Sequence, residues 1–343
     1  MSYGIVATGE ALGEPVTITD EVIESYTTDS EAIRSWGYRS FHRAKDGTYL
    51  TDLAVQAAEQ ALDTASADAA DIDLIVLAIT DFSEYLCWDA AAALQGRIGA
   101  RRAEAILANQ ACCSGVIAFD TVAGRLATHP DYHNALIVAA NQICDTYQNR
   151  MGSSTSVLSD GAAAALVRRG HPHRTWLATE VISDGRYADF YRMDTGGTVH
   201  PFGAPEAPGQ EESQQAGNPM DRVSELLNND ARRMLEFFGK FRGNMRVAVD
   251  RVCARTGTDI AEIKRFIHLN DNQQSMGDIA RALGIPLERL NGDLALDHGH
   301  FGSADQILGL HQLIAAGELN DGDLVALTTL GAGMHWAVTL LRL

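Results

Sequence analysis

Short apolar segments alternate with helix-like segments along this chain, and this alternation constrains its fold more than any other feature. Segments of the length and composition of buried strands occur at residues 71–80, 134–142, 162–170 and 323–333. Residues 49–65 carry apolar side chains at helical spacing, with Thr51 as the N-cap candidate, and lead into the first of them. Residues 304–319 lead into the last one in the same way. We therefore predict an α/β fold that contains an internal duplication.

Length and charge narrow the class of protein. A chain of 343 residues, 46% of them hydrophobic, can form one large two-lobed domain or two similar domains. No apolar segment approaches the ~20 residues of a membrane span, and the N-terminal residues lack the pattern of a secretion signal, so we expect a soluble cytoplasmic protein. The net charge of −18 argues against nucleic acid as a partner.

The cysteine pattern argues against a metal centre and against a disulfide framework. The five cysteines form an odd set without CxxC spacing, at positions 87, 112, 113, 144 and 253. The sequence also lacks a phosphate-binding Gly-rich motif and clustered His/Cys ligands. We expect no permanently bound cofactor and no metal.

Residues 106–127, ILANQACCSGVIAFDTVAGRLA, hold the candidate nucleophile. A strand-like end is followed by the small residues 111–115, which suit a sharp turn, and by a largely apolar helix-like segment. A cysteine at such a helix N-terminus has a stabilised thiolate, beside backbone N–H groups that can bind an oxyanion. Free cysteines are also frequent in protein cores, so ordinary packing is the alternative. At this level Cys112 and Cys113 are equivalent.

Two later segments depart from the α/β pattern. Residues 191–220 hold four of the eight prolines and little periodicity, which predicts a long irregular excursion, suited to a lid over a pocket. Residues 232–265 contain nine basic residues in a strongly acidic chain. This basic segment is either a solvated helix face or a docking surface for an acidic partner or a phosphate-bearing ligand.

Several blocks in order carry a family resemblance. They are IRSWGYRSFHRA (33–44), DIDLIVLAITD (71–81), ACCSGVIAF (111–119), LSDGAAAALVRR (158–169), FIHLNDNQQSM (266–276), LDHGHFGSADQILGL (296–310) and DGDLVALTTLGAGMHWAVTLLRL (321–343). Together they resemble the β-ketoacyl-acyl-carrier-protein synthase III family from end to end. The resemblance implies the thiolase fold, with duplicated βαβαβαββ halves (1–175 and 176–343) in a five-layered αβαβα arrangement.

The resemblance also implies a catalytic set. In the family the nucleophilic cysteine precedes a small residue and a glycine, a register that selects Cys113. It implies His268 as the catalytic histidine and places His300 where the family has an asparagine, which gives a Cys-His-His set. An altered loop after His268 leaves Asn270 or Asn272 as the supporting asparagine. The remaining implied site residues are Asp305, as a residue that orients an imidazole, and Ala332, whose backbone N–H would complete an oxyanion hole with that of Cys113.

Weaker matches concern substrates and partners. Tyr85 and Leu86 lie where a dimer partner lines the acyl pocket in the family, although core packing explains them nearly as well. Trp36 and Arg39 match contacts to coenzyme A or phosphopantetheine. Gln273 stands where the family usually has a basic residue for the carrier protein. The expected partners are thus an acyl-CoA or acyl carrier protein, a small-molecule acceptor and a second copy of the chain.

The function implied is acyl transfer through acyl-Cys113 to a hydroxyl, an amine or a carrier thiol. A second histidine can act as a general base toward such acceptors, which an asparagine cannot. This feature favours a role in specialised polyketide or natural-product metabolism. Decarboxylative C–C condensation with a malonyl thioester is the first alternative. A non-catalytic partner subunit that binds a carrier protein is the second.

Overall fold

The central feature of the computed structural model, which describes residues 2–27, 29–194, 196–201 and 219–343, is a mixed sheet. Its strands are β1 (Tyr3–Leu12), β4 (Leu74–Ile79), β5 (Glu104–Asn109), β6 (Asn134–Asn141), β7 (Gly161–Arg169), β8 (Thr175–Ser183), β9 (Ile263–Ile267), β10 (Leu324–Gly331) and β11 (His335–Arg342). They follow one another in the order β5-β4-β6-β7-β1-β8-β11-β10-β9. Among the described residues, strands β1 and β8 pair at the single position Gly4–Thr175, so the sheet divides there into two sets.

The two sets repeat one strand order. In the first, β4 and β6 are parallel, β7 is antiparallel to β6, and β1 is antiparallel to β7. In the second, β9, β10, β11 and β8 follow with the same orientations. The counterpart of β5 is reduced to one parallel bridge between Phe266 and Leu290. The internal duplication predicted from the sequence is therefore visible in the topology, although the division of the chain at residue 175 remains a prediction.

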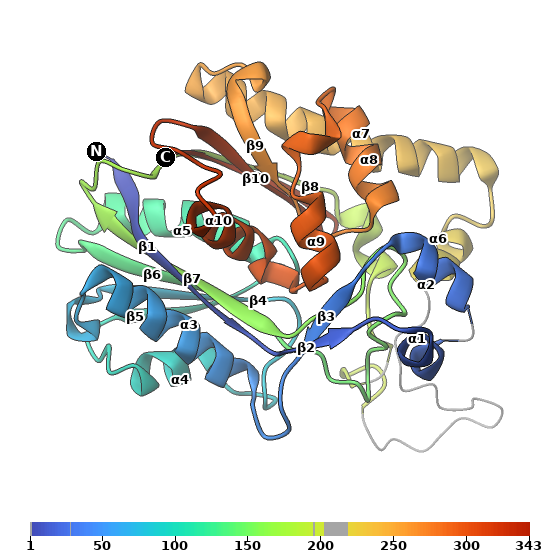
Figure 1. Ribbon diagram of the computed structural model, residues 1–343, viewed down its shortest axis with the longest axis horizontal. Coiled ribbons are helices and arrows are strands. Elements are labelled where there is room, and N and C mark those ends of the chain that lie inside the picture. The colour runs from blue at the N-terminus through green and yellow to red at the C-terminus, as the bar shows by residue number, and fades with distance from the viewer. Residues whose placement is uncertain (1, 28, 195, 202–218) are drawn as a thin grey trace.

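Helices cover both sets of strands and separate them (Figure 1). Helix α3 (Leu50–Ala65) and helix α4 (Ala90–Arg97) pack on the outer face of the first set. Helix α5 (Ser114–Thr128) and helix α10 (Asp305–Ala315) contact strands of both sets and form the middle layer. The long helix α7 (Ala231–Thr256), with α8 (Gln273–Leu283), covers the second set. This is the predicted αβαβα arrangement.

Burial explains the layers. Strand β4 is buried along its whole length, as expected for a strand with helices on both faces. The middle helices are apolar on most sides and share one core with both sets of strands, through residues such as Phe119, Ile307 and Val325. Separate cores lie beneath α3 and beneath α7. At ~25 cal/mol per Å² of buried apolar surface, these cores supply most of the driving force for folding.

Smaller elements lie beside the layers near the active-site end. A hairpin of β2 (Glu14–Thr17) and β3 (Ser40–Arg43) is flanked by α1 (Asp20–Tyr26) and α2 (Ser30–Trp36), which share a small core. Helix α9 (Gly292–His298) contacts β3, and α6 (Pro219–Leu226) contacts the short 3-10 helix at Gly185–Phe190.

Most predicted elements are present, with corrections at their ends. The four apolar runs form β4, β6, β7 and β10, and the two helical segments form α3 and α10. Thr51 is not the N-cap of α3: Tyr49 holds that position, because the Asp52 carboxylate accepts a hydrogen bond from its backbone N–H at 2.7 Å. Of the predicted excursion at 191–220, residues 195 and 202–218 lie outside the described residues. No helix in the described part of the chain is long and apolar enough to cross a membrane.

Candidate active site

A sharp turn between β5 and α5 positions two consecutive cysteines. Ala111 has a left-handed backbone, with φ of 50°, and the Ser114 hydroxyl accepts a hydrogen bond from the Gln110 N–H at 2.6 Å. Gly115 lies against the backbone of Ser303, where a Cβ atom would come within 2.1 Å of the carbonyl oxygen. This close approach explains why a glycine follows the cysteines.

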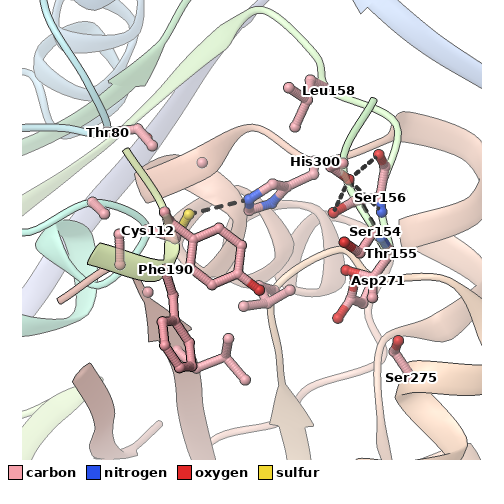
Figure 2. Close-up of a pocket in the computed structure, with 18 of the residues that line it drawn as sticks. Thr80, Cys112, Ser154, Thr155, Ser156, Leu158, Phe190, Asp271, Ser275 and His300 are labelled. Atoms are coloured by element: carbon pink, nitrogen blue, oxygen red, sulfur yellow. Dashed lines mark hydrogen bonds between the residues drawn. The ribbon is translucent and has the colours of Figure 1, made fainter. Parts of the chain in front are cut away.

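The turn directs the two cysteine side chains into different environments. Cys112 lines a cavity of ≈ 370 Å³, and its Sγ lies 3.2 Å from Nε2 of His300 (Figure 2). Cys113 is fully buried, and its Sγ lies 3.6 Å from the carbonyl oxygen of His335. Burial, with a contribution from Cys112, raises the pKa of the Cys113 thiol well above its ordinary value.

The structure places the two cysteines differently from what the predicted register implies. The sequence match selects Cys113, yet the structure brings Cys112 to the cavity and to the imidazole. The physical reason is that α5 begins at Ser114 with Cys113 as its N-cap, so Cys113 points into the core. The backbone N–H of Cys113, for which the oxyanion role is predicted, donates to the Gln110 carbonyl at 3.2 Å.

His300 links Cys112 to a buried carboxylate. Its Nδ1 lies 2.5 Å from Oδ2 of Asp305, a fully buried side chain at the first position of α10. The other Asp305 oxygen accepts from the Phe301 N–H at 2.7 Å, which fixes the carboxylate. Burial lowers the pKa of His300, but the charges of Asp305 and Cys112 outweigh it, so that the pKa lies well above its ordinary value. The structure thus brings together His300 and Asp305, both predicted from the sequence.

The backbone around His300 is fixed by the opposite half of the chain. The His300 N–H donates to the Val157 carbonyl at 2.7 Å, and the His300 carbonyl accepts from the Ser159 N–H at 2.8 Å. Gly299 has φ of 70°, and a Cβ there would lie 2.5 Å from the Ser159 hydroxyl. Only glycine fits this position, which explains the His-Gly-His sequence before α10.

His268, at the end of β9, is fully buried in a different setting. Its Nδ1 lies 2.9 Å from the Thr328 hydroxyl, and its Nε2 has no hydrogen-bond partner among the described residues. Burial, with the charge on His300 adding to it, lowers the pKa of His268 to about 3. The cavity is lined by its neighbours Leu269 and Asp271 instead of by His268 itself.

The two candidate asparagines hold the backbone. Asn270 donates from Nδ2 to the Gly299 carbonyl at 2.8 Å and accepts from Nδ2 of Asn291 at 2.9 Å. Asn272 caps α8 by accepting from the Ser275 N–H at 2.9 Å. Neither is part of the cavity lining, and the residue between them, Asp271, is. The sequence argument missed Asp271, although the altered loop after His268 was the signal for it.

The remaining predicted residues are spread over the molecule. Ala332, in the turn between β10 and β11, lines the cavity as expected. Tyr85 and Leu86 are each 67% exposed, so core packing within one chain does not explain them. Trp36 packs in the small core of α1 and α2, and Arg39 pairs with Asp297. The structure does not bring Trp36 or Arg39 to the cavity.

The cavity has an apolar and a polar side. The apolar side is formed by Phe190, Phe238, Phe241, Ile279, Leu330 and Met334. The polar side is formed by Ser153, Ser154, Thr155, Ser156, Asp271 and Ser275. Among the described residues, no group of three or more His, Cys, Asp or Glu side chains could hold a metal ion. A thiol that contacts an imidazole, which in turn contacts a carboxylate, can form and break an acyl-cysteine bond.

Similarity to known proteins shows which family the chain belongs to. Sequence profiles of 3-oxoacyl-[acyl-carrier-protein] synthase III match residues 108–185, and those of its C-terminal part match residues 253–343. The β-ketoacyl-[acyl-carrier-protein] synthase III of Gloeobacter violaceus is 30% identical over 98% of this chain and 94% of its own length. The chain belongs to the β-ketoacyl-acyl-carrier-protein synthase III family. The family member of Syntrophomonas wolfei is 27% identical over the whole chain and 98% of its own length.

Solved structures agree with this assignment at the level of the fold. A structure named ChlB3 and described as an acyltransferase superposes with a TM-score of 0.87 at 20% identity, covering 100% of this chain and 98% of its own. The 3-oxoacyl-(acyl carrier protein) synthase III of Pseudomonas aeruginosa PAO1 gives 0.80 at 23% identity, with the same coverage. The thiolase fold expected from the sequence is therefore confirmed. As a member of this synthase III family, the protein is an acyl-transferring enzyme.

Proposed function

We propose that the protein transfers an acyl group from a CoA or acyl-carrier-protein thioester, through an acyl-Cys112 intermediate, to a hydroxyl, amine or thiol of a second substrate. The observation that carries this proposal is that Cys112 and His300 line a cavity in contact with each other, with Asp305 buried behind the imidazole. The relatives named above are named for acyl-carrier-protein chemistry, which supports a thioester as the donor. We place the enzyme in specialised metabolism because His300 supplies a base toward such acceptors.

The chemistry follows from the three side chains. The Cys112 thiolate attacks the thioester carbonyl, and collapse of the tetrahedral intermediate releases the donor thiolate, which takes a proton from His300. In the second half-reaction His300 accepts the proton of the acceptor hydroxyl or amine as it attacks acyl-Cys112. The C–S bond then breaks, and the Cys112 thiolate forms again beside protonated His300. Asp305 holds the imidazole in orientation and favours its charged form.

Backbone N–H groups of Cys112 and Ala332 are our candidates for the oxyanion hole. Ala332 lines the cavity, and the preceding Gly331 packs against the turn that carries the cysteines. A Cβ at Gly331 would lie 3.2 Å from the Cys112 nitrogen, so the two backbone segments are adjacent. Two N–H groups converging beside the nucleophile would stabilise the negative oxygen of the tetrahedral intermediate.

The path by which the acyl donor approaches and the pairing of two copies of the chain are also proposals. Phe238, Phe241 and Arg242 of the basic helix α7 line the cavity, which supports approach of a phosphate-bearing arm or an acidic carrier protein along this helix. Several of its arginines are engaged in ion pairs, such as Arg242 with Asp278 and Arg255 with Glu180. The exposure of Tyr85 and Leu86 supports a second copy of the chain at that surface.

Decarboxylative condensation is the second candidate. The relatives are named as β-ketoacyl synthases, and the unpartnered Nε2 of His268 is the feature of this chain that favours it. A neutral imidazole can donate a hydrogen bond to an enolate oxygen, as condensation with a malonyl thioester requires. Release of carbon dioxide from malonyl-CoA in the presence of an acylated enzyme, and its loss in His268→Ala, would establish condensation over simple transfer.

Intact-mass measurement of acylation tests the central proposal. The protein is incubated with a panel of acyl-CoA and acyl-carrier thioesters, and wild type is compared with Cys112→Ala and Cys113→Ala. We expect the mass of one acyl group on wild type and on Cys113→Ala, and none on Cys112→Ala. Acylation of Cys112→Ala but not of Cys113→Ala would restore the register predicted from the sequence. Acylation of none of them would favour a non-catalytic partner subunit.

A further inference from the structure

Asp271 is a buried carboxylate on the cavity wall that the chemistry above does not use. Its side chain is 6% exposed, and its Oδ1 has no hydrogen-bond partner among the described residues. The Ser154 hydroxyl, on the same wall, is also buried and unpartnered. Buried polar atoms are nearly always hydrogen-bonded, since leaving one unpaired costs ~1–3 kcal/mol. Two such atoms on one wall therefore point to a ligand that pairs with them.

The contacts within the fold account for only part of the Asp271 side chain. Its neighbours Asn270 and Asn272 both use their side chains to hold the backbone. The Asp271 carboxylate interacts with Thr155 and Ser156 of the facing loop, yet its Oδ1 has no partner among the described residues. Burial raises the pKa of Asp271 to about 6, although the Thr155 hydroxyl and the charge of His300 act in the opposite direction. The contacts with the 153–156 loop therefore leave one oxygen of this buried carboxylate available to a ligand.

The polar side of the cavity is held rigidly before any ligand binds. Within the loop, the Ser153 hydroxyl accepts from the Ser156 N–H at 2.8 Å and donates to the Ser156 carbonyl at 2.6 Å. The Thr155 carbonyl accepts from the Asn272 N–H at 3.1 Å, which ties this loop to the Asp271 loop. None of these bonds needs the Ser154 hydroxyl. Two fixed loops thus present an unpaired acceptor and an unpaired hydroxyl.

The position of these groups relates them to the second half-reaction. Figure 2 shows His300 between Cys112 on one side and Ser154, Thr155 and Asp271 on the other. An acceptor that gives its proton to His300 and attacks acyl-Cys112 would extend toward Asp271. The apolar side, with Phe190, Phe238 and Phe241, suits the acyl chain instead.

We propose that Asp271 and Ser154 form an acceptor subsite, which binds a hydroxyl or amino group of the acceptor other than the one that is acylated. The inference rests on the proposed function and deepens it, because it assigns the acceptor to polyhydroxylated or amino-hydroxylated small molecules. A carboxylate accepts hydrogen bonds from O–H and N–H groups and pairs with an ammonium group. The donor thioester fits this subsite less well, because its phosphate groups carry the same charge as Asp271.

Deacylation of acyl-Cys112 by matched nucleophiles tests the subsite. The enzyme is acylated with the acyl-CoA that reacts fastest, and loss of the acyl mass is followed with glycerol, ethanolamine or 1-propanol at equal concentration. We expect glycerol and ethanolamine to deacylate wild type roughly tenfold faster than 1-propanol, as one charge-assisted hydrogen bond would give. In Asp271→Asn and Ser154→Ala this preference should shrink, while the rate of acylation is retained. Asp131→Asn, at an exposed position, is the control with the same charge change.

Two results would overturn the subsite. One is an equal preference in wild type and Asp271→Asn. The other is a loss of acylation rate in Asp271→Asn as large as the loss of transfer, which would assign Asp271 to the donor arm. Saturation-transfer NMR of glycerol, ethanolamine and 1-propanol on the unacylated protein separates this proposal from the proposed function. If the protein forms no acyl-enzyme, stronger signals for glycerol and ethanolamine that Asp271→Asn abolishes would support the subsite, and their absence would refute it.

Discussion

His268 and His300 are both buried and lie close enough to influence each other's charge, yet their environments differ. His300 stands between Cys112 and Asp305, and its pKa is raised well above the ordinary value because these two groups outweigh burial. Among the described residues, the Thr328 hydroxyl is the only hydrogen-bond partner of the His268 side chain, and burial together with the charge of His300 lowers its pKa to about 3. One imidazole is therefore kept cationic beside the thiol, and the other is kept neutral.

For these two imidazoles, the neighbouring groups decide the direction of the pKa shift more than burial does. Both side chains are almost completely buried, and burial alone disfavours the charge on each of them. A carboxylate at 2.5 Å reverses that effect for His300, whereas a hydroxyl at 2.9 Å does not for His268. We infer that proton transfer belongs to His300 and that His268 acts, if it contacts substrate, as a neutral hydrogen-bonding group.

The largest effect should come from removing the cationic imidazole. In His300→Ala, formation of acyl-Cys112 should slow by about 10³-fold, within the range for loss of a general acid–base group. In His268→Ala the same step should slow by no more than about tenfold, because a neutral imidazole does not supply the proton. Rapid-quench intact-mass measurements give both rates. Equal losses in the two variants would remove the distinction between the histidines.

Removing the charge of Asp305 should make the protonation state of His300 resemble that of His268. In Asp305→Asn burial is no longer offset by the carboxylate, so the pKa of His300 should fall and the Cys112 thiolate should lose its cationic partner. We expect alkylation of Cys112 by iodoacetamide at pH 7 to slow by ~10-fold or more, because the thiolate is the reactive form and loses the neighbouring positive charge that favours it. Peptide mapping separates Cys112 from the exposed Cys87 and Cys144. An unchanged rate would show that Asp305 only positions the ring.

Much of the fold could be predicted from the sequence, because the strands lie between helices on both faces. Residues 71–80 and 323–333 form β4 and β10, whose side chains are largely buried, and this burial accounts for their apolar composition. The contact between His300 and Asp305 was also accessible, since both residues lie on one short stretch of chain between Gly299 and the start of α10. In these cases local sequence and local structure agree.

The different environments of Cys112 and Cys113 could not be predicted, because they depend on how the turn between β5 and α5 directs each side chain. Adjacent residues in a turn point in different directions, and the direction here is set by the left-handed Ala111 and by the Ser114 hydroxyl. Asp271 was missed for a similar reason. The folded structure alone shows that two loops distant in the sequence share one wall, where the Asn272 N–H donates to the Thr155 carbonyl.

The smallest effect that we predict concerns stability at low pH and reports on His268 directly. Its pKa is about 3 in the folded protein and ~6.5 when unfolded, so the unfolded state binds more protons between these values. The stability from a neutral His268 is therefore present above pH 6.5 and is lost as the pH falls toward 3. Between pH 6.5 and 5.5, wild type should lose about 1 kcal/mol more unfolding free energy than His268→Gln, measured by urea denaturation. His300 and Asp271 titrate in both proteins, so their contributions largely cancel in this difference. An equal loss would mean that His268 keeps an ordinary pKa, and the two histidines would then be alike in charge.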